Sequence, residues 1–165
     1  FGRFKQSHGH ELPLNLKLNL MTGAYLERLY HGRLYAKAQN VRPTFVKQYN
    51  EAFARVDLLA MPTTGMKAPA YQEPKDYEEA IERTLFGGRL GMPLEPIVRN
   101  TCPFNFTGHP AISIPCGKSN GLPIGLMLVA PHFSEDQLLR AAYAYQCSVD
   151  WPSLFPGQAS AGEDG

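Results

Sequence analysis

The chain has 165 residues, a formal net charge of +1 at pH 7, and a composition that is 44% hydrophobic and 19% charged. A chain of this length can bury roughly 70% of the surface of its unfolded form, so a globular domain is expected. No block of basic residues stands out, which argues against a nucleic-acid partner. No apolar run reaches the roughly 18 residues that a membrane span requires, which argues against a membrane partner.

The cysteines and the start of the chain indicate its compartment and context. Cys102, Cys116 and Cys147 are a sparse, odd-numbered set without CxxC or CxxH spacing. Reduced thiols in a cytoplasmic protein explain them better than a disulfide or a metal site. The first residue is Phe1 and not an initiator Met, and no signal peptide is recognisable. We therefore expect a part of a longer, cytoplasmic polypeptide.

Residues 1–13 are polar and are predicted to form a loop. A helical periodicity follows from residue 14 to about residue 55. Residues 14–55 are expected to form two or three helices, with a break at Gly32 and with Pro43 in the first turn of the last helix. Apolar residues recur in this last helix at a period of 3.6, which predicts one buried stripe. The stripe comprises Val41, Phe45, Tyr49, Ala52, Phe53 and Val56.

A short apolar run over residues 57–62 ends at a Pro-Thr-Thr-Gly segment. Such a run predicts a strand that is buried on both faces. A loop to Lys75 follows. Asp76 and Glu79 have the spacing of a capping box, which predicts a helix that extends to about Leu85.

Two more strands are predicted over residues 111–116 and 123–130. The link between them is too short for a parallel crossover, so they are expected to pair antiparallel. The second strand is apolar without alternation, which predicts cover on both faces. Because three strands do not complete such a sheet, the predicted fold class is α/β, with a mixed sheet between helices that strands from elsewhere complete.

The last predicted helix begins after Ser134, which forms a second capping-box pattern with Gln137. Four apolar residues are expected to share its buried face: Leu138, Leu139, Ala142 and Tyr143. Residues 152–165 are rich in Gly, Ser and Pro, which predicts a disordered tail. Residues 1–151 are therefore interpreted as one portion of a single domain.

Ser119 lies in the segment GKSNG, which matches the G-x-S-x-G pattern of a nucleophile elbow. That motif needs a strand before the Ser and a helix after it, whereas a strand is predicted after Ser119. A hairpin turn is therefore the favoured interpretation, and a hydrolase complete in this chain with Ser119 as nucleophile is the less favoured one.

The histidines and the glycine motifs offer little evidence for a cofactor. His8 and His10 are two residues apart and lack a third ligand, so no metal site is predicted. His109 either faces a pocket or packs in the core as a hydrogen-bonded residue, and His132 is expected in a loop. No GxxxxGK[ST] or GxGxxG motif is present, so neither a nucleotide nor any other cofactor is expected.

Three segments together resemble the amidase signature family. Residues 100–146 (NTCPFNFTGHPAISIPCGKSNGLPIGLMLVAPHFSEDQLLRAAYAYQ) resemble the carboxyl-terminal end of family members. Residues 35–42 (YAKAQNVR) and 56–64 (VDLLAMPTT) resemble the long helix and the strand that precede this end. The similarity covers most of residues 14–146, in the order and spacing of the family.

The resemblance implies an α/β fold with a twisted mixed sheet covered by helices, and an activity that hydrolyses carboxamides. Family members use a Ser nucleophile, a second Ser held through a cis peptide, and a Lys base, with both serines in a Gly/Ser-rich stretch. This chain has no Gly-Ser-Ser or Gly-Gly-Ser run. The catalytic residues are therefore expected upstream of this segment and none within it, and the segment alone is expected to be inactive.

The resemblance also implies that the segment before residue 111 lies near the acyl pocket. Five residues are therefore candidates for substrate binding: Asn100, Thr101, Phe104, Asn105 and His109. The alternative is that Asn105 and Thr107 cap or turn the backbone and that Phe104 and Phe106 fill the core. Both interpretations are left open by the sequence.

The expected partners are a small-molecule amide substrate and the amino-terminal remainder of the same polypeptide, and a homodimer is left open. The subfamily that transamidates tRNA-linked glutamate uses an Arg before the Lys-Ala-Gln segment. Residues 15–19 (NLKLN) lack Arg, which favours a plain amidase for small or aryl-aliphatic amides. A non-catalytic binding or scaffold subunit of the same fold is the alternative.

Overall fold

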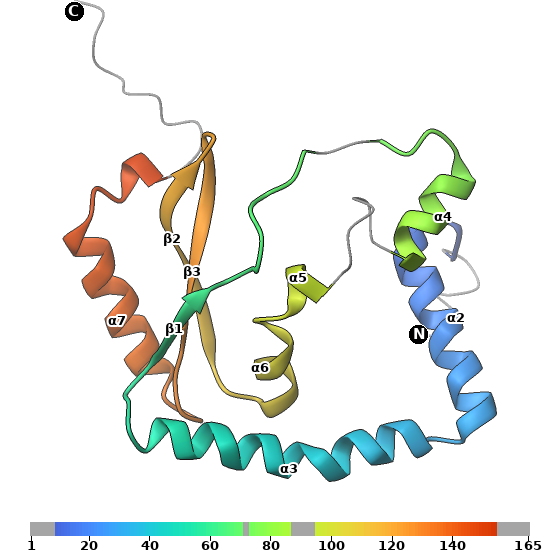
Figure 1. Cartoon of the computed structure of the whole chain (residues 1–165), viewed down its shortest axis with the longest axis horizontal. Helices are drawn as coiled ribbons and strands as arrows, with labels where there is room; N and C mark the ends of the chain where they lie inside the picture. Colours follow the sequence, from blue (N-terminus) through green and yellow to red (C-terminus); the bar gives the residue numbers. More distant parts are fainter. Residues whose placement is uncertain (1–8, 71–72, 87–94, 155–165) are drawn as a thin grey trace, which may run out of the picture. The chain divides into compact units, whose positions relative to one another are not determined.

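The structure, a computed structural model, describes residues 9–70, 73–86 and 95–154 (Figure 1). The chain divides into two compact units. The first comprises Phe1–Val41 and Ala70–Pro93, and the second comprises Arg42–Pro69 and Leu94–Gly165. All strands of the described residues belong to the second unit.

The helical first unit contains the elements η1 (Gly9–Glu11), α2 (Leu14–Tyr30), the beginning of α3 (Arg33–Phe53) and α4 (Tyr77–Phe86). The predicted break at Gly32 is confirmed, because α2 ends at Tyr30, its C-cap residue His31 has φ of 48°, and Gly32 follows with φ of 74°. This left-handed conformation suits Gly and ends helices. Of the predicted loop over residues 1–13, η1 forms a short 3-10 turn, and residues 1–8 lie outside the described residues.

The prediction that Pro43 begins a helix is wrong. Helix α3 runs without interruption from Arg33 to Phe53 and contains Pro43 in its interior. A Pro at this place removes the backbone hydrogen bond to the carbonyl of Gln39. Gln39 is exposed, so water can hydrate the freed carbonyl, and the helix tolerates the Pro.

The predicted capping box of α4 forms with one shifted partner. The backbone N–H of Glu79 donates to Asp76 Oδ1 at 2.8 Å. The reciprocal bond to Glu79 Oε2, at 2.6 Å, comes from the N–H of Lys75, where a standard box would use Asp76. The helix ends at Phe86, one residue beyond the predicted end.

The second unit is built on a three-stranded sheet in the order β1-β3-β2 (Figure 1). Its strands are β1 (Leu59–Pro62), β2 (Ala111–Ser119) and β3 (Leu122–Val129). The predicted antiparallel pairing of the last two strands is confirmed, with Ile112 opposite Leu128. Strand β1 also pairs antiparallel with β3. The parallel pairing that a mixed sheet requires is absent from the described residues.

A two-residue turn connects β2 to β3. Asn120 and Gly121 have φ of 53° and 76°, the left-handed conformations of a type I′ hairpin turn. Ser119 is the last residue of β2 and lies opposite Leu122. The predicted hairpin is therefore confirmed, since a strand and not a helix follows Ser119.

The second half of β3 forms the core, because alternate residues of a strand point to opposite faces. Leu128 belongs to a buried cluster with Leu138 of α7 (Glu135–Ser148), which covers one face of the sheet (Figure 1). Met127 and Val129 belong to a second cluster with Phe104 of α6 (Cys102–Thr107). Tyr49 and Phe53 of α3 pack against this second cluster. Helix α3 therefore uses part of the predicted apolar stripe.

The prediction that residues 57–62 and 123–130 are buried on both faces is wrong for much of their length. Strand β1 alternates between half-buried and exposed residues. In β3, Leu122 is 47% exposed and Ile124 is 36% exposed. The reason is that the buried clusters of the described residues gather at the opposite end of β3 and leave the hairpin end uncovered.

Two predictions for α7 are also wrong. The side chain of Ser134 makes no capping hydrogen bond, and only its backbone carbonyl accepts from Gln137 and Leu138 N–H. Leu139 and Tyr143 are 62% and 67% exposed and do not share the buried face of Leu138. The helix covers the sheet with Leu138, Ala141, Ala142 and Tyr145. These residues follow the i, i+3, i+4, i+7 spacing of one helical face.

The end of the described chain packs against α7, where the Trp151 ring lies 6.5 Å from the Tyr145 ring. Of the predicted tail over residues 152–165, the first three residues form η3 (Pro152–Leu154), and residues 155–165 lie outside the described residues. Among the described helices, none has both the length and the hydropathy of a membrane span.

Candidate functional site

A hollow of about 260 Å³ lies in the second unit, between α6, the first residues of β2 and the segment after β1. Its lining comprises Thr63, Thr101, Phe104, Asn105, His109, Ala111, Ile112, Ser113 and Met127. Four of the five residues that the sequence singled out for substrate binding therefore meet at one place. They are Thr101, Phe104, Asn105 and His109.

Asn100, the fifth candidate, does not line this hollow. Its Nδ2 donates a hydrogen bond to the carbonyl of Pro62 at 2.7 Å. This bond joins the last residue of β1 to the segment just before α6. Asn100 thus helps to fix two walls of the hollow relative to each other.

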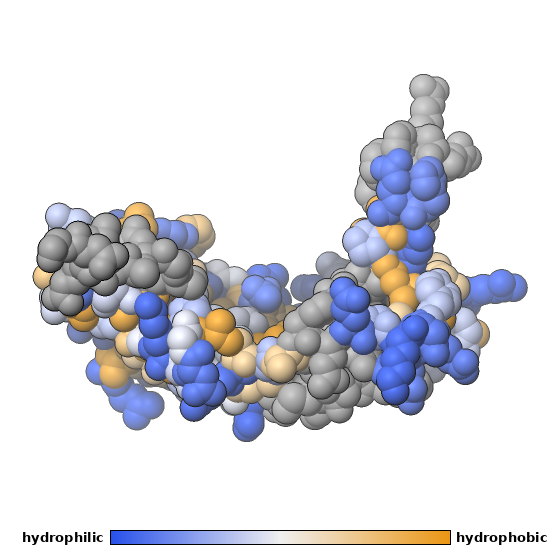
Figure 2. Space-filling model, turned by 90° about the horizontal axis from the view of Figure 1, so that it is seen from above, coloured by the Kyte–Doolittle hydropathy of each residue, from blue (hydrophilic) through white to orange (hydrophobic). Residues whose placement is uncertain are grey.

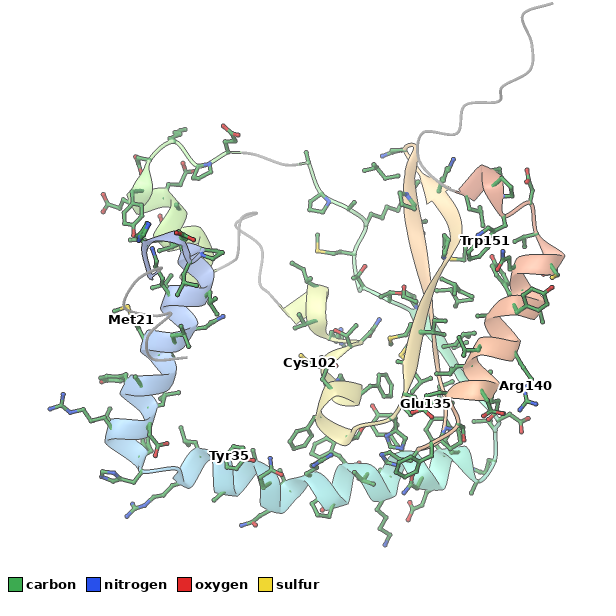
Figure 3. All side chains as sticks on the ribbon, turned by 180° about the vertical axis from the view of Figure 1, so that it is seen from behind. Met21, Tyr35, Cys102, Glu135, Arg140 and Trp151 are labelled. Carbon is green, nitrogen blue, oxygen red and sulfur yellow. The ribbon has the colours of Figure 1, made fainter. Side chains whose placement is uncertain are left out.

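The local sequence explains the short helix α6. Pro103 lies in its first turn, where a missing N–H costs nothing, and Gly108 ends it with φ of 83°. The N–H of Gly108 donates to the carbonyl of Phe104 at 2.8 Å. Cys102 begins the helix and is exposed (Figure 3). The tight end of α6 directs the chain into β2 through His109.

His109 is only 4% exposed, and both of its ring nitrogens have partners. Nδ1 lies 2.8 Å from Thr107 Oγ1, and Nε2 lies 3.2 Å from Asn50 Oδ1. The rings of Tyr49 and Phe53 lie 5.6 and 5.3 Å from the imidazole. These contacts match the packed, hydrogen-bonded interpretation of His109, which is also one of the lining residues of the hollow.

The hydrogen bonds around His109 indicate which ring nitrogen carries the proton. The Thr107 hydroxyl donates to the carbonyl of Pro103 at 2.9 Å, so it accepts from His109 Nδ1–H. The His132 ring stacks on His109 at 3.9 Å. Burial, and then the charge of His132, lower the pKa of His109 below its ordinary value of 6.5. His109 is therefore mainly neutral at pH 7. With the proton on Nδ1, Nε2 is an acceptor, and a flip of the Asn50 amide group lets its N–H donate to Nε2.

Sequence reasoning missed two residues of the hollow, Thr63 and Ser113. Their hydroxyl oxygens lie 2.6 Å apart. They meet above Gly125, where an added Cβ would lie 2.7 Å from Thr63 Oγ1 and 2.9 Å from Ser113 Oγ. A Gly inside a strand pattern signals such a close approach, and Gly125 was the signal that could have found this pair.

The described residues offer little support for a metal site, for a disulfide or for a second site that involves the predicted residues. They contain no group of three or more His, Cys, Asp or Glu side chains that could hold a metal ion. Cys102, Cys116 and Cys147 are free and exposed. A larger hollow of about 500 Å³ lies between residues 64–69, Ile97 and the β2–β3 hairpin, and none of the five predicted site residues lines it.

The fold occurs in solved amidase structures. A bacterial aryl acylamidase of the amidase signature enzymes superposes with a TM-score of 0.60 at 20% identity, over 95% of this chain and 31% of that chain. One subunit of the glutamyl-tRNA(Gln) amidotransferase of Thermotoga maritima superposes with a TM-score of 0.56 at 26% identity. This alignment covers 92% of this chain and 31% of that chain. The predicted α/β fold class is therefore confirmed.

The sequence identifies the family. The profile of the family described as Amidase matches residues 3–139. This chain belongs to the Amidase family, which confirms the resemblance found in its sequence. The corresponding glutamyl-tRNA(Gln) amidotransferase subunit of Methanosarcina mazei is 36% identical over 146 residues, which cover 88% of this chain. The chain spans 28% of the length of that relative.

Proposed function

We propose that this chain is the carboxyl-terminal part of an amidase, an enzyme that hydrolyses the C–N bond of a carboxamide to a carboxylate and ammonia or an amine. The family match over residues 3–139 is the observation that carries the proposal. The convergence of Thr101, Phe104, Asn105 and His109 on one hollow supports their role as a wall of the substrate site. Asn100 takes part in this proposal as the residue that holds the wall to β1.

The reaction needs groups that lie upstream of this segment. A Ser hydroxyl becomes nucleophilic only beside a base, and the tetrahedral oxyanion needs preorganised N–H donors. We propose a Ser nucleophile, a second Ser and a Lys base in the preceding part of the polypeptide. The present residues would then hold the substrate and exclude water, and by themselves they would hydrolyse nothing.

The exposed apolar surface supports a partner from the same polypeptide. Met21, Tyr25 and Leu29 of α2 follow one another at i+4 spacing and are 67%, 63% and 50% exposed. Figure 2 shows hydrophobic residues at the molecular surface, and Figure 3 labels Met21 of this stripe. Such a stripe is normally buried in a globular protein. We propose that the amino-terminal remainder of the polypeptide covers it.

The location and the substrate follow from the same proposal. Three free, exposed thiols suit a reducing compartment, so we place the enzyme in the cytoplasm. The substrate is a small-molecule amide, and neither nucleic acid nor a membrane is part of the proposal. Whether the enzyme forms a homodimer stays a prediction.

A second candidate is one subunit of a glutamyl-tRNA(Gln) amidotransferase, with further protein subunits as partners. The observation that favours it is the name of the Methanosarcina mazei relative. The lack of Arg in residues 15–19 favours the plain amidase instead. The two candidates differ in whether small amides are hydrolysed without a tRNA-linked substrate.

The test uses the complete polypeptide that carries this segment. Ammonia release from primary amides and amine release from anilides are measured with and without glutamyl-tRNA. The plain amidase releases both products without tRNA, whereas the second candidate requires the tRNA-linked substrate. A polypeptide without a Lys and a double-Ser stretch upstream of Phe1, and without turnover, would be the non-catalytic scaffold and would refute the proposal.

A further inference from the structure

We propose that the hydroxyl groups of Thr63 and Ser113 form the binding contact for a neutral carboxamide group of the substrate. This proposal rests on the proposed function, because it assigns the hollow to a substrate. It adds two residues to the wall. Thr63 comes from the segment after β1 and Ser113 from β2, whereas Thr101 precedes α6 and Asn105 lies within it.

The pair is held in place from several directions. The N–H of Thr63 donates to the carbonyl of Gly125 at 2.9 Å, which continues the β1–β3 ladder by one residue. The preceding residue, Pro62, accepts the bond from Asn100 Nδ2 at 2.7 Å. Ser113 lies within β2, opposite Met127. Because Gly125 has no side chain, the two hydroxyls can meet at 2.6 Å.

The remaining hydrogen-bonding capacity of the pair determines what it can bind. Each hydroxyl has one O–H donor and two acceptor lone pairs. One O–H is used between Thr63 and Ser113, whichever residue donates it. The second O–H has no acceptor among the described residues, and lone pairs of both oxygens remain. The pair therefore offers a donor and an acceptor side by side, which match the C=O and the N–H of a carboxamide.

The remaining lining selects for a neutral group. None of the nine described lining residues is Asp, Glu, Lys or Arg, and His109 is neutral. A carboxylate or an ammonium group would meet no opposite charge among these residues, whereas a neutral amide needs none. Phe104, Ile112 and Met127 supply apolar surface for the hydrocarbon part of an amide. The hollow thus combines the hydroxyl pair, Thr101 and Asn105 with an apolar floor.

The experiment measures binding of benzamide by isothermal titration calorimetry to the complete polypeptide in which the proposed upstream Ser nucleophile is replaced by Ala, so that benzamide is not hydrolysed during the titration. This parent protein carries the wild-type residues Thr63 and Ser113 and is the wild type of the binding comparison. The variant Thr63→Val with Ser113→Ala removes both hydroxyls at nearly unchanged volume. It is expected to raise the Kd of benzamide about fivefold to tenfold, the range of one or two lost hydrogen bonds. Thr63→Ser keeps the hydroxyl and is expected to bind benzamide as the wild type does.

Matched controls remove hydroxyls that lie elsewhere. Thr64 Oγ1 donates to the carbonyl of Met66, and Ser148 Oγ donates to the carbonyl of Tyr145. Thr64→Val and Ser148→Ala are expected to leave the Kd of benzamide unchanged. Thermal melts identify any variant that fails to fold, and the single variants Thr63→Val and Ser113→Ala then replace the double variant.

The outcomes separate this proposal from the proposed function. Wild-type Kd for benzamide in the double variant, or tighter binding of benzoate than of benzamide by the wild type, would overturn the hydroxyl contact even if the enzyme hydrolyses amides. Absence of amide hydrolysis by the wild type would overturn the proposed function. Weaker benzamide binding in the double variant together with wild-type binding in Thr63→Ser supports the contact.

Discussion

The two halves of β3 have the same apolar character and opposite environments. Leu122 and Ile124, at the hairpin end, are 47% and 36% exposed, whereas Met127 and Val129 are 3% and 0% exposed. Both halves pair with β2 along their length. The difference comes from the helices, since α7 on one face and α3 with α6 on the other bury only the second half.

This comparison shows that composition alone does not define a core. An apolar strand predicts burial, but the cover must come from another element. At the carboxyl-terminal end of β3, the described helices α3, α6 and α7 supply this cover. At the hairpin end they do not, which agrees with a chain that spans 28% of the length of its Methanosarcina mazei relative. This contrast can be tested by substituting a buried residue and an exposed residue of the same type.

The largest effect is expected for Phe104→Ala, compared with Phe133→Ala. Phe104 is 5% exposed and packs on Tyr49 at a ring distance of 5.1 Å, whereas Phe133 is 93% exposed. Loss of the buried ring should lower the free energy of unfolding by about 3–5 kcal/mol, and loss of the exposed ring by less than about 0.5 kcal/mol. Urea denaturation of both variants measures this, and equal losses would refute the assigned core.

A comparison within α7 sharpens the position of the helix on the sheet. Leu138 is 4% exposed and its neighbour Leu139 is 62% exposed. Leu138→Ala should cost about 2–4 kcal/mol of unfolding free energy, and Leu139→Ala less than about 0.5 kcal/mol. Chemical denaturation is again the measurement. A larger loss for Leu139→Ala would mean that α7 presents its other face to the sheet.

Gly125→Val tests the close approach below the hydroxyl pair, with Gly117→Val as its control. A Cβ at Gly125 would meet Thr63 Oγ1 at 2.7 Å, whereas a Cβ at Gly117 meets nothing within 4 Å. Gly125→Val should destabilise the fold by about 1–3 kcal/mol through overpacking, and Gly117→Val should be nearly neutral. Thermal melts of the two variants decide. A neutral Gly125→Val would contradict the geometry of the pair.

The smallest effect is a pH dependence from His109. Its pKa in the folded state is lowered from 6.5 by burial and by His132, so the unfolded chain binds the proton more readily. The stability that neutral His109 contributes is therefore present above pH 6.5 and is lost as the pH falls below it. Urea midpoints between about pH 5.5 and 7.5 measure this loss.

Two variants test the assignment of this pH dependence. His109→Gln should flatten the profile below pH 6.5, because the titrating group is removed. His31→Asn, a change at an exposed residue with a left-handed backbone, should leave the profile unchanged. An unchanged profile in His109→Gln would show that another group titrates in this range.

Several features of the fold followed from the sequence for identifiable reasons. Gly32 and the Asn120-Gly121 turn carry backbone preferences that act locally, and both were predicted correctly. The position of Pro43 was predicted wrongly because Pro usually lies in the first turn of a helix. Here the carbonyl that Pro43 leaves without a donor belongs to the exposed Gln39, so the helix tolerates Pro43 in its interior. The face of α7 was misjudged because Leu138 and Leu139 are equally apolar. Only packing on the sheet distinguishes them.

The candidate site was predictable in part. Thr101, Phe104, Asn105 and His109 come from one continuous segment, so one motif was enough to group them. Thr63 and Ser113 are 50 positions apart in sequence, and only strand pairing through β3 brings them together. The hydrogen bond between His109 and Asn50 likewise depends on the docking of α3. For such long-range contacts the local sequence offers at most an indirect signal, such as Gly125 within a strand, and it does not name the residues that meet.

The most direct test of the account compares amide hydrolysis by residues 1–165 with that of the complete polypeptide, using matched molar concentrations and ammonia release as the readout. The account predicts turnover by the complete polypeptide and none by residues 1–165. Hydrolysis by residues 1–165 alone, abolished by Ser119→Ala, would contradict it, because the reactive centre would then lie within this chain.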